Sequence, residues 1–187
     1  IGFTPSENFS GTVDLSFKYY STEKFGSATS DPGSGSFSIT VDPVADTPSI
    51  TSSVISNAVK NQTLSLVDTN SASVFSLTSP DTDGSETLRL NVRLITEGTH
   101  QILGTTGVDG LYSFSVAELA NFQIIPETDF FGTMSLQIYA SSAEANSSSS
   151  AQSEAETYDI VFTNVTDAPV LSTSNVTGSE DQNISTG

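Results

Sequence analysis

The stretch "SPDTDGSETL" places three carboxylates around one glycine. Asp81 and Asp83 are two residues apart, so in an extended segment their side chains point to the same side of the chain. Gly84 can adopt a positive φ and turn the backbone, which would bring Glu86 back toward the two aspartates. Ca²⁺ binds about six to eight oxygen ligands and would remove the repulsion between these charges. From this stretch alone a calcium site and a plain solvent-exposed turn both remain open, and the plain turn is slightly favoured because Asp, Gly and Ser are common turn residues.

A second set of acidic residues lies at two D-x-P motifs, "ADTP" and "TDAP". Asp46 and Asp167 belong to these motifs, Asp42 precedes the first, and Glu180 and Asp181 follow the second. Carboxylates that gather where two domains meet can share an ion and fix the interdomain angle. The alternative is that they are only polar residues around a proline, but their recurrence at a fixed interval favours the ion.

The chain contains an internal repeat. "FTPSENFSGTVDLSF" and "IIPETDFFGTMSLQI" share the frame P-x-x-x-F-x-G-T-x-x-L, and Pro5 and Pro126 are 121 residues apart in it. The two D-x-P motifs have the same spacing. We therefore expect a tandem repeat of about 121 residues. Residues 1–46 are then the C-terminal part of one unit, 47–168 a complete unit, and 169–187 the start of a further unit.

Within a unit the hydrophobic pattern has a period of two. "TLRLNVRLI", "TMSLQIYA" and "TYDIVF" alternate apolar and polar residues, and Gly, Pro, Asn and Asp separate such runs. This pattern predicts an all-β fold, an immunoglobulin-like or cadherin-like β-sandwich. Only residues 115–122, "SVAELANF", are expected to form a short helical turn. Residues 141–157 lack apolar periodicity and are expected to form a mobile loop.

The first part of the chain is an incomplete unit. Its apolar residues, such as Phe17 and Phe37, need a partner surface, because half of a sandwich cannot bury its own apolar face. We expect something outside residues 1–46 to complete it. Sequence upstream, a second chain and the segment 169–187 are the three alternatives.

Composition limits the classes of partner. The chain has 22 acidic against five basic residues and a net charge of -17, which argues against binding to nucleic acid or anionic membranes. No apolar run approaches the ~18 residues that a membrane-spanning helix needs, so no membrane insertion is expected. The absence of cysteine favours a bacterial extracellular protein or a cytosolic one.

Catalytic chemistry has little support in the sequence. His100 is the single histidine, and we expect it to be an ordinary surface residue. The serines lack a G-x-S-x-G frame, and Asp81 and Asp83 are neighbours in one turn, whereas the carboxylates of a glycosidase flank a cleft. We therefore do not expect an enzyme.

The stretch "DTDGSETL", the block "IIPETDFFGTMSLQIYA" and the closing "VTDAP" resemble the tandem repeats of bacterial RTX adhesins exported by type I secretion. The resemblance covers essentially the whole chain. It implies β-sandwich units that bind calcium within and between them, with Asp81, Asp83, Glu86, Asp46 and Asp167 as the ligand candidates. It also implies an extracellular location at the bacterial cell surface.

The resemblance implies a function in adhesion or biofilm formation. Calcium-stiffened units would project ligand-binding domains from the cell, with neighbouring repeats as direct partners and host-cell or surface ligands bound by other domains of the parent protein. The alternative is that the chain belongs to the ligand-binding region, as a domain split around an inserted sugar- or peptide-binding module. The chain departs from the family at "YASSAE", where Ser141 and Ser142 replace an A-x-D motif, so no calcium ligand is implied at these serines.

Overall fold

Alternating apolar and polar residues form short β-strands at intervals between Gly11 and Phe162. The structure, a computed structural model, describes residues 2–81 and 84–184. Within them the fold is all-β with antiparallel sheets, and the only helix is the 3-10 turn η1 (Glu118–Asn121), inside the segment for which a helical turn was predicted. The strands are β1 (Gly11–Tyr19), β2 (Gly33–Val41), β3 (Ser49–Ser52), β4 (Leu64–Ser65), β5 (Phe75–Thr78), β6 (Glu86–Leu94), β7 (Gln101–Leu103), β8 (Gly107–Val108), β9 (Leu111–Ser115), β10 (Gln123–Ile125), β11 (Gly132–Glu144), β12 (Ser150–Gln152) and β13 (Glu156–Phe162).

The main sheet has the strand order β12-β11-β6-β9-β8, and β13 also pairs with β11. One edge of β11 pairs with β6, from Leu136↔Leu94 to Glu144↔Glu86. Its other edge pairs first with β13 and then with β12. β11 thus runs through the whole sheet, and its two ends mark the two ends of the body.

A single buried core joins the main sheet to two smaller sheets, β4-β10-β7 and β3-β5. Leu90 and Val92 of β6 are fully buried, as the period-two pattern of "TLRLNVRLI" predicts. Phe122 stacks on Phe75 and Phe114 with ring centroids 6.1 and 4.4 Å apart. The apolar faces of all three sheets therefore converge on one interior.

The prediction of a mobile loop at residues 141–157 is wrong. β11 continues to Glu144, and after a turn β12 returns alongside it. The inward-facing positions here are Ala140, Ser142 and Glu144, all of them buried. Because small and polar side chains occupy these inward positions, the apolar alternation disappears from the sequence although the strand continues.

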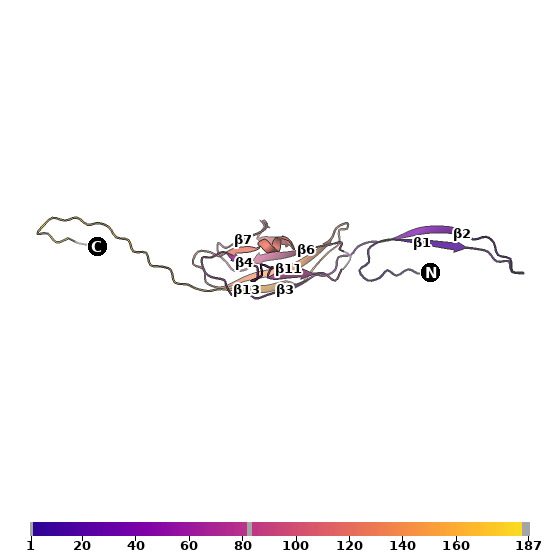
Figure 1. Cartoon of the computed structure of the whole chain (residues 1–187), viewed down its shortest axis with the longest axis horizontal. Helices are drawn as coiled ribbons and strands as arrows, with labels where there is room; N and C mark the ends of the chain where they lie inside the picture. Colours follow the sequence, from indigo (N-terminus) through magenta and orange to yellow (C-terminus); the bar gives the residue numbers. More distant parts are fainter. Residues whose placement is uncertain (1, 82–83, 185–187) are drawn as a thin grey trace.

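The remaining parts extend from the two ends of this body (Figure 1). β1 and β2 form a separate hairpin, and Phe17 and Phe37 are exposed on it. The segment after β13 is extended and lies at the end of the molecule opposite the hairpin (Figure 1). Residues 169–184 therefore do not cover the apolar face of the hairpin, which removes one of the three expected ways to complete it.

In the described part of the chain, no helix has the length and apolar character needed to cross a membrane.

Candidate metal centre

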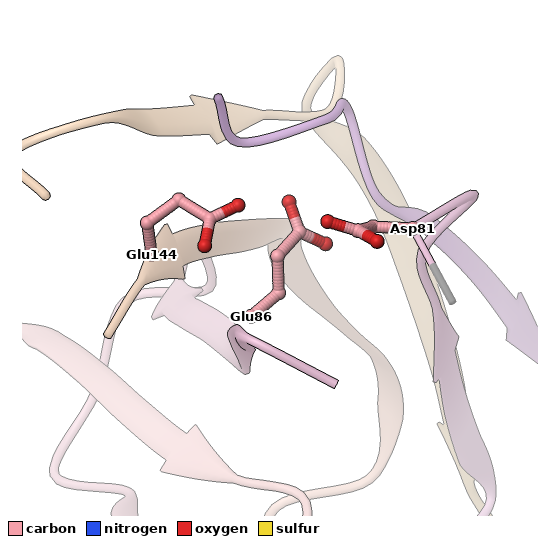
Figure 2. A group of neighbouring side chains, drawn as sticks. All are labelled: Asp81, Glu86 and Glu144. Atoms are coloured by element: carbon pink, nitrogen blue, oxygen red, sulfur yellow. The ribbon is translucent and has the colours of Figure 1, made fainter. Parts of the chain in front are cut away.

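Three carboxylates converge at the end of the body that meets the linker from the hairpin. Asp81 lies in the loop after β5, Glu86 is the first residue of β6, and Glu144 is the last residue of β11. One carboxylate oxygen from each lies within 4.8 Å of the others, and Glu86 lies between the other two (Figure 2). Two strand ends and one loop thus bring three acidic groups to one point.

Local backbone geometry explains how these groups meet. Gly84 has a φ of 79°, a left-handed conformation that turns the chain between Asp81 and the start of β6. The ladder then pairs Glu86 directly with Glu144, and Ala145 N–H donates a hydrogen bond of 3.1 Å to the Ser85 carbonyl beside them. Like charges directly opposite in a ladder are destabilising, so this placement calls for a compensating positive charge.

Glu144 is the least compensated of the three. It is only 5% exposed, and both of its carboxylate oxygens are buried without a hydrogen bond from any residue that the structure describes. A carboxylate that is buried without a partner lowers the stability of the fold by on the order of several kcal/mol. A bound cation would supply the missing partner.

Glu86, in contrast, is held in place by hydrogen bonds. Its Oε1 accepts a bond of 2.6 Å from the Asp46 backbone N–H, and its Oε2 accepts one from the Ser79 hydroxyl. Hydrogen bonds of this kind orient a ligand carboxylate and leave further lone pairs for a metal. Glu86 therefore connects the acidic cluster to the linker.

The linker is fixed to this end of the body by its backbone. The Asp46 carbonyl accepts a bond of 2.6 Å from the buried Ser142 hydroxyl, and Ala45 N–H donates one of 2.9 Å to Ser149 Oγ. From the hairpin side, Asn8 Nδ2 donates a bond of 3.0 Å to the Pro80 carbonyl, next to the acidic loop. A change at the acidic cluster therefore reaches the connection between hairpin and body directly.

A pocket of about 220 Å³ lies between the hairpin and the acidic loop. Asp42, Asp46 and Asp81 line it together with Asn8 and Phe9. Two of the predicted linker aspartates thus lie beside the cluster, and Asp46 contacts it through its backbone N–H, which donates a hydrogen bond to Glu86.

The donor set fits a hard cation. All three groups are carboxylates, and oxygen ligands suit Mg²⁺, Ca²⁺ and Mn²⁺, whereas the softer metals prefer nitrogen or sulfur. Mg²⁺ keeps several waters and is usually held by one or two carboxylates. Three convergent carboxylates, one of them buried, fit Ca²⁺ better.

The structure brings together only part of the predicted ligand set. Asp81 and Glu86 meet as expected, while Asp83 lies outside the described residues. Glu180 and Asp181 belong to the segment after β13, which extends from the end of the body opposite the hairpin (Figure 1). Asp167 follows β13, at the opposite end of the body.

Asp167 has a cation of the chain as its partner. Lys60 Nζ lies 2.7 Å from Asp167 Oδ2 and 3.5 Å from Asp129 Oδ1, and Lys60 is only 7% exposed. Asn61 and Asp129 exchange two hydrogen bonds of 2.9 and 2.7 Å beside it. The hydrogen bond to Asp167 raises the pKa of Lys60. The pKa of Asp129 is lowered, mainly by the hydrogen bond from the Asn61 side chain and next by the positive charge of Lys60.

The sequence prediction missed Glu144, although a signal for it was present. The buried positions of β11 continue at every second residue through Ile138, Ala140 and Ser142 to Glu144. An acidic residue at an inward position of a strand is rare unless it is paired. Extending the period-two count through "YASSAE" would have identified Glu144 as an inward-facing acid, although not which residues it meets.

His100 contributes to packing at the start of β7. Its Nδ1 accepts a hydrogen bond of 2.8 Å from Glu127 N–H, and its ring packs edge-on against Phe130 with centroids 4.6 Å apart. These contacts tie β7 to the loop before β11.

Neither a protein-family model nor a curated protein sequence matches the chain.

Proposed function

We propose that the chain is a calcium-stiffened repeat of a large extracellular bacterial adhesin, built from tandem β-sandwich units. The metal is held by Asp81, Glu86 and Glu144, next to the linker that joins one unit to the next. The observation that carries this proposal is the buried carboxylate of Glu144, which faces Glu86 across the ladder and lacks a hydrogen bond among the described residues.

The tandem arrangement is supported by two strand pairs that have the same register. β1 pairs with β2 from Gly11↔Val41, and β11 pairs with β13 from Gly132↔Phe162, so both partners are shifted by the repeat length of the sequence. The residue three positions before each first glycine is also left-handed in both copies, with φ of 57° at Asn8 and 62° at Asp129. This shared register supports the interpretation of the segment before the linker as the last hairpin of a unit.

The β-sandwich interpretation of the complete unit is supported by its core. The main sheet packs through Leu90 and Met134, and the smaller sheets pack through Leu64 and Phe75, all into the same buried cluster. Two layers of antiparallel strands around one interior are the arrangement of a sandwich.

Calcium stiffens the linker through Glu86. The same carboxylate faces the metal position and accepts the Asp46 N–H, so a cation that fixes Glu86 also fixes the backbone of the linker. Without the cation, Glu86 and Glu144 repel each other and the contact to Asp46 is weakened. In the adhesin, stiff connections of this kind project ligand-binding domains away from the cell, toward a host or another surface.

Calcium titration of the chain tests the proposal. At a calcium concentration about a hundredfold above Kd, a site that forms only in the folded state adds ~2.7 kcal/mol to stability. Isothermal titration calorimetry should detect binding, thermal unfolding should shift by several degrees, and X-ray scattering should show a more extended and narrower distribution of shapes than in EDTA.

The matched variants are Glu144→Gln and Glu156→Gln. Glu156 is an exposed glutamate at the start of β13, so its substitution removes the same charge away from the cluster. The calcium response should disappear in the first variant and persist in the second. The proposal would be contradicted if calcium gave the wild-type chain neither a heat of binding nor a shift in unfolding temperature, or if both variants responded equally to calcium.

A further inference from the structure

The two linker aspartates, Asp46 and Asp167, use different groups for their contacts. Asp46 is bound through its backbone by the unit that follows it, at Glu86 and Ser142. Asp167 is bound through its carboxylate by the unit that precedes it, at Lys60. The two aspartates occupy corresponding positions in the repeat, 121 residues apart.

We propose that each such linker aspartate is a two-sided latch between units. At Asp167 the carboxylate is held by Lys60, and its backbone N–H and carbonyl are presented to the counterparts of Glu86 and Ser142 in the next unit. The partner surface is therefore the acidic end of a further repeat of the same kind. This inference rests on the tandem arrangement in the proposed function, and it adds a contact that needs no metal.

The side-chain half of the latch is well anchored. Lys60 lies in a segment that pairs in parallel with the residue after β13. Lys60 N–H donates a hydrogen bond of 3.1 Å to the Thr163 carbonyl, and Thr163 N–H donates one of 2.9 Å to the Ala58 carbonyl. The lysine stem is buried, so its ammonium group has a fixed position between Asp129 and Asp167. Asp167 follows Thr163 by only four residues, and the ion pair fixes the direction in which the chain leaves the body.

The backbone half uses groups that the side-chain half leaves available. Both hydrogen bonds at Asp46 involve its main-chain N–H and carbonyl, while the ion pair at Asp167 involves only Oδ2. One aspartate can therefore make both sets of contacts at once. The lysine side is an ion pair within the chain, whereas the Glu86 side depends on the acidic cluster, so calcium acts on one half only.

A chain with a duplicated unit tests the latch. Residues 1–167 followed by residues 47–187 contain the whole sequence and a new junction, in which Asp167 lies between Lys60 of one copy and Glu86 and Ser142 of the next. Spin labels on the two complete units report the distribution of distances across this junction, and hydrogen exchange reports the amides of residues 164–167 of the first copy. Both are measured in EDTA and in calcium.

The variants are Lys60→Met in the first copy, Asp167→Asn, and the control Lys24→Met at an exposed loop lysine. Methionine retains the buried stem without the charge, and Asp167 is itself exposed, so at least the second change leaves the fold intact. Both test variants should broaden the distances and speed exchange several-fold in EDTA and in calcium, and the control should do neither. Distances unchanged by Asp167→Asn would overturn the latch.

The outcomes also separate the latch from the calcium proposal. Glu144→Gln in the second copy should broaden the distance distribution in calcium and should not broaden it in EDTA. A chain that does not respond to calcium but is loosened by Lys60→Met would retain the latch and overturn the calcium site. A chain that responds to calcium and ignores Lys60→Met and Asp167→Asn would do the reverse.

Discussion

Glu144 and Glu86 are direct cross-strand partners at the last position of the β6–β11 ladder. Glu86 is oriented by Asp46 and Ser79, whereas Glu144 is buried without such bonds among the described residues. The pair therefore combines a fixed ligand group with an uncompensated one, and the first prediction concerns the second of them.

Glu144→Gln should stabilise the chain in EDTA. The amide removes a repelling charge and can donate a hydrogen bond to Glu86. The gain should be at least the roughly 0.2–1 kcal/mol of a cross-strand pair, because the substitution also removes a buried charge. Urea unfolding in EDTA measures it. A variant that is less stable than the wild type without metal would show that the carboxylate of Glu144 already has a stabilising partner in the metal-free protein.

Ser142→Ala should loosen the linker. The substitution removes the hydrogen bond from a buried hydroxyl to the Asp46 carbonyl, which costs about 1 kcal/mol. Hydrogen exchange at residues 44–47 should become faster while the β11 core is unchanged. Ser148→Ala, at an exposed turn position, is the matched control and should leave this exchange as it is in the wild type.

The Lys60 cluster should make stability pH-dependent at both extremes when calcium is absent. The pKa of Asp129 is lowered from its usual 3.8, so its contribution is complete above that value and is lost as pH falls through the lower folded pKa. The pKa of Lys60 is raised from 10.5, so its contribution is complete below that value and is lost as pH rises through the higher folded pKa. Urea midpoints against pH should show both losses, and Lys60→Met should remove the alkaline one.

The repeat provides a matched pair of core and surface substitutions. Phe17 of β1 and Ile138 of β11 occupy the same register position, but Phe17 is 47% exposed and Ile138 is 2% exposed. Ile138→Ala should cost roughly 2–5 kcal/mol, as for other buried aliphatic residues. Phe17→Ala should change the stability of the body by no more than ~0.5 kcal/mol. Thermal unfolding of both variants checks this.

A large loss from Phe17→Ala would mean that the apolar face of the hairpin is covered in the isolated chain, for example by a second copy. Sedimentation at several concentrations would then detect the association. In a longer parent protein, the remaining strands of the first unit would cover the same face.

Much of the fold could be predicted from the sequence because apolar residues occupy the buried positions of most strands. The alternation at Leu90 and Val92 and the left-handed turn at Gly84 follow from side-chain size and backbone freedom alone. The strand around Ser142 was not predictable in this way, because its buried positions hold residues whose hydropathy resembles that of a loop.

The candidate site was predictable only where its residues are close in sequence. Asp81 and Glu86 meet through one turn, and local spacing was sufficient to place them together. Glu144 reaches them only through the β6–β11 register, which no local pattern reveals. Lys60 meets Asp167 in the same way, through a bridge between segments that are distant in sequence, so no local pattern indicates that this aspartate has a cationic partner.

The parallel bridge between Val59 and Thr163 has a mechanical consequence. Its two segments lie near opposite ends of the sequence of the unit, so tension applied at the two linkers would pull them past each other along their length. The hydrogen bonds of Ala58 and Lys60 to Thr163 would then be strained together and not one after another. A filament assembled from such units would resist stretching most strongly beside Lys60, far from the acidic end.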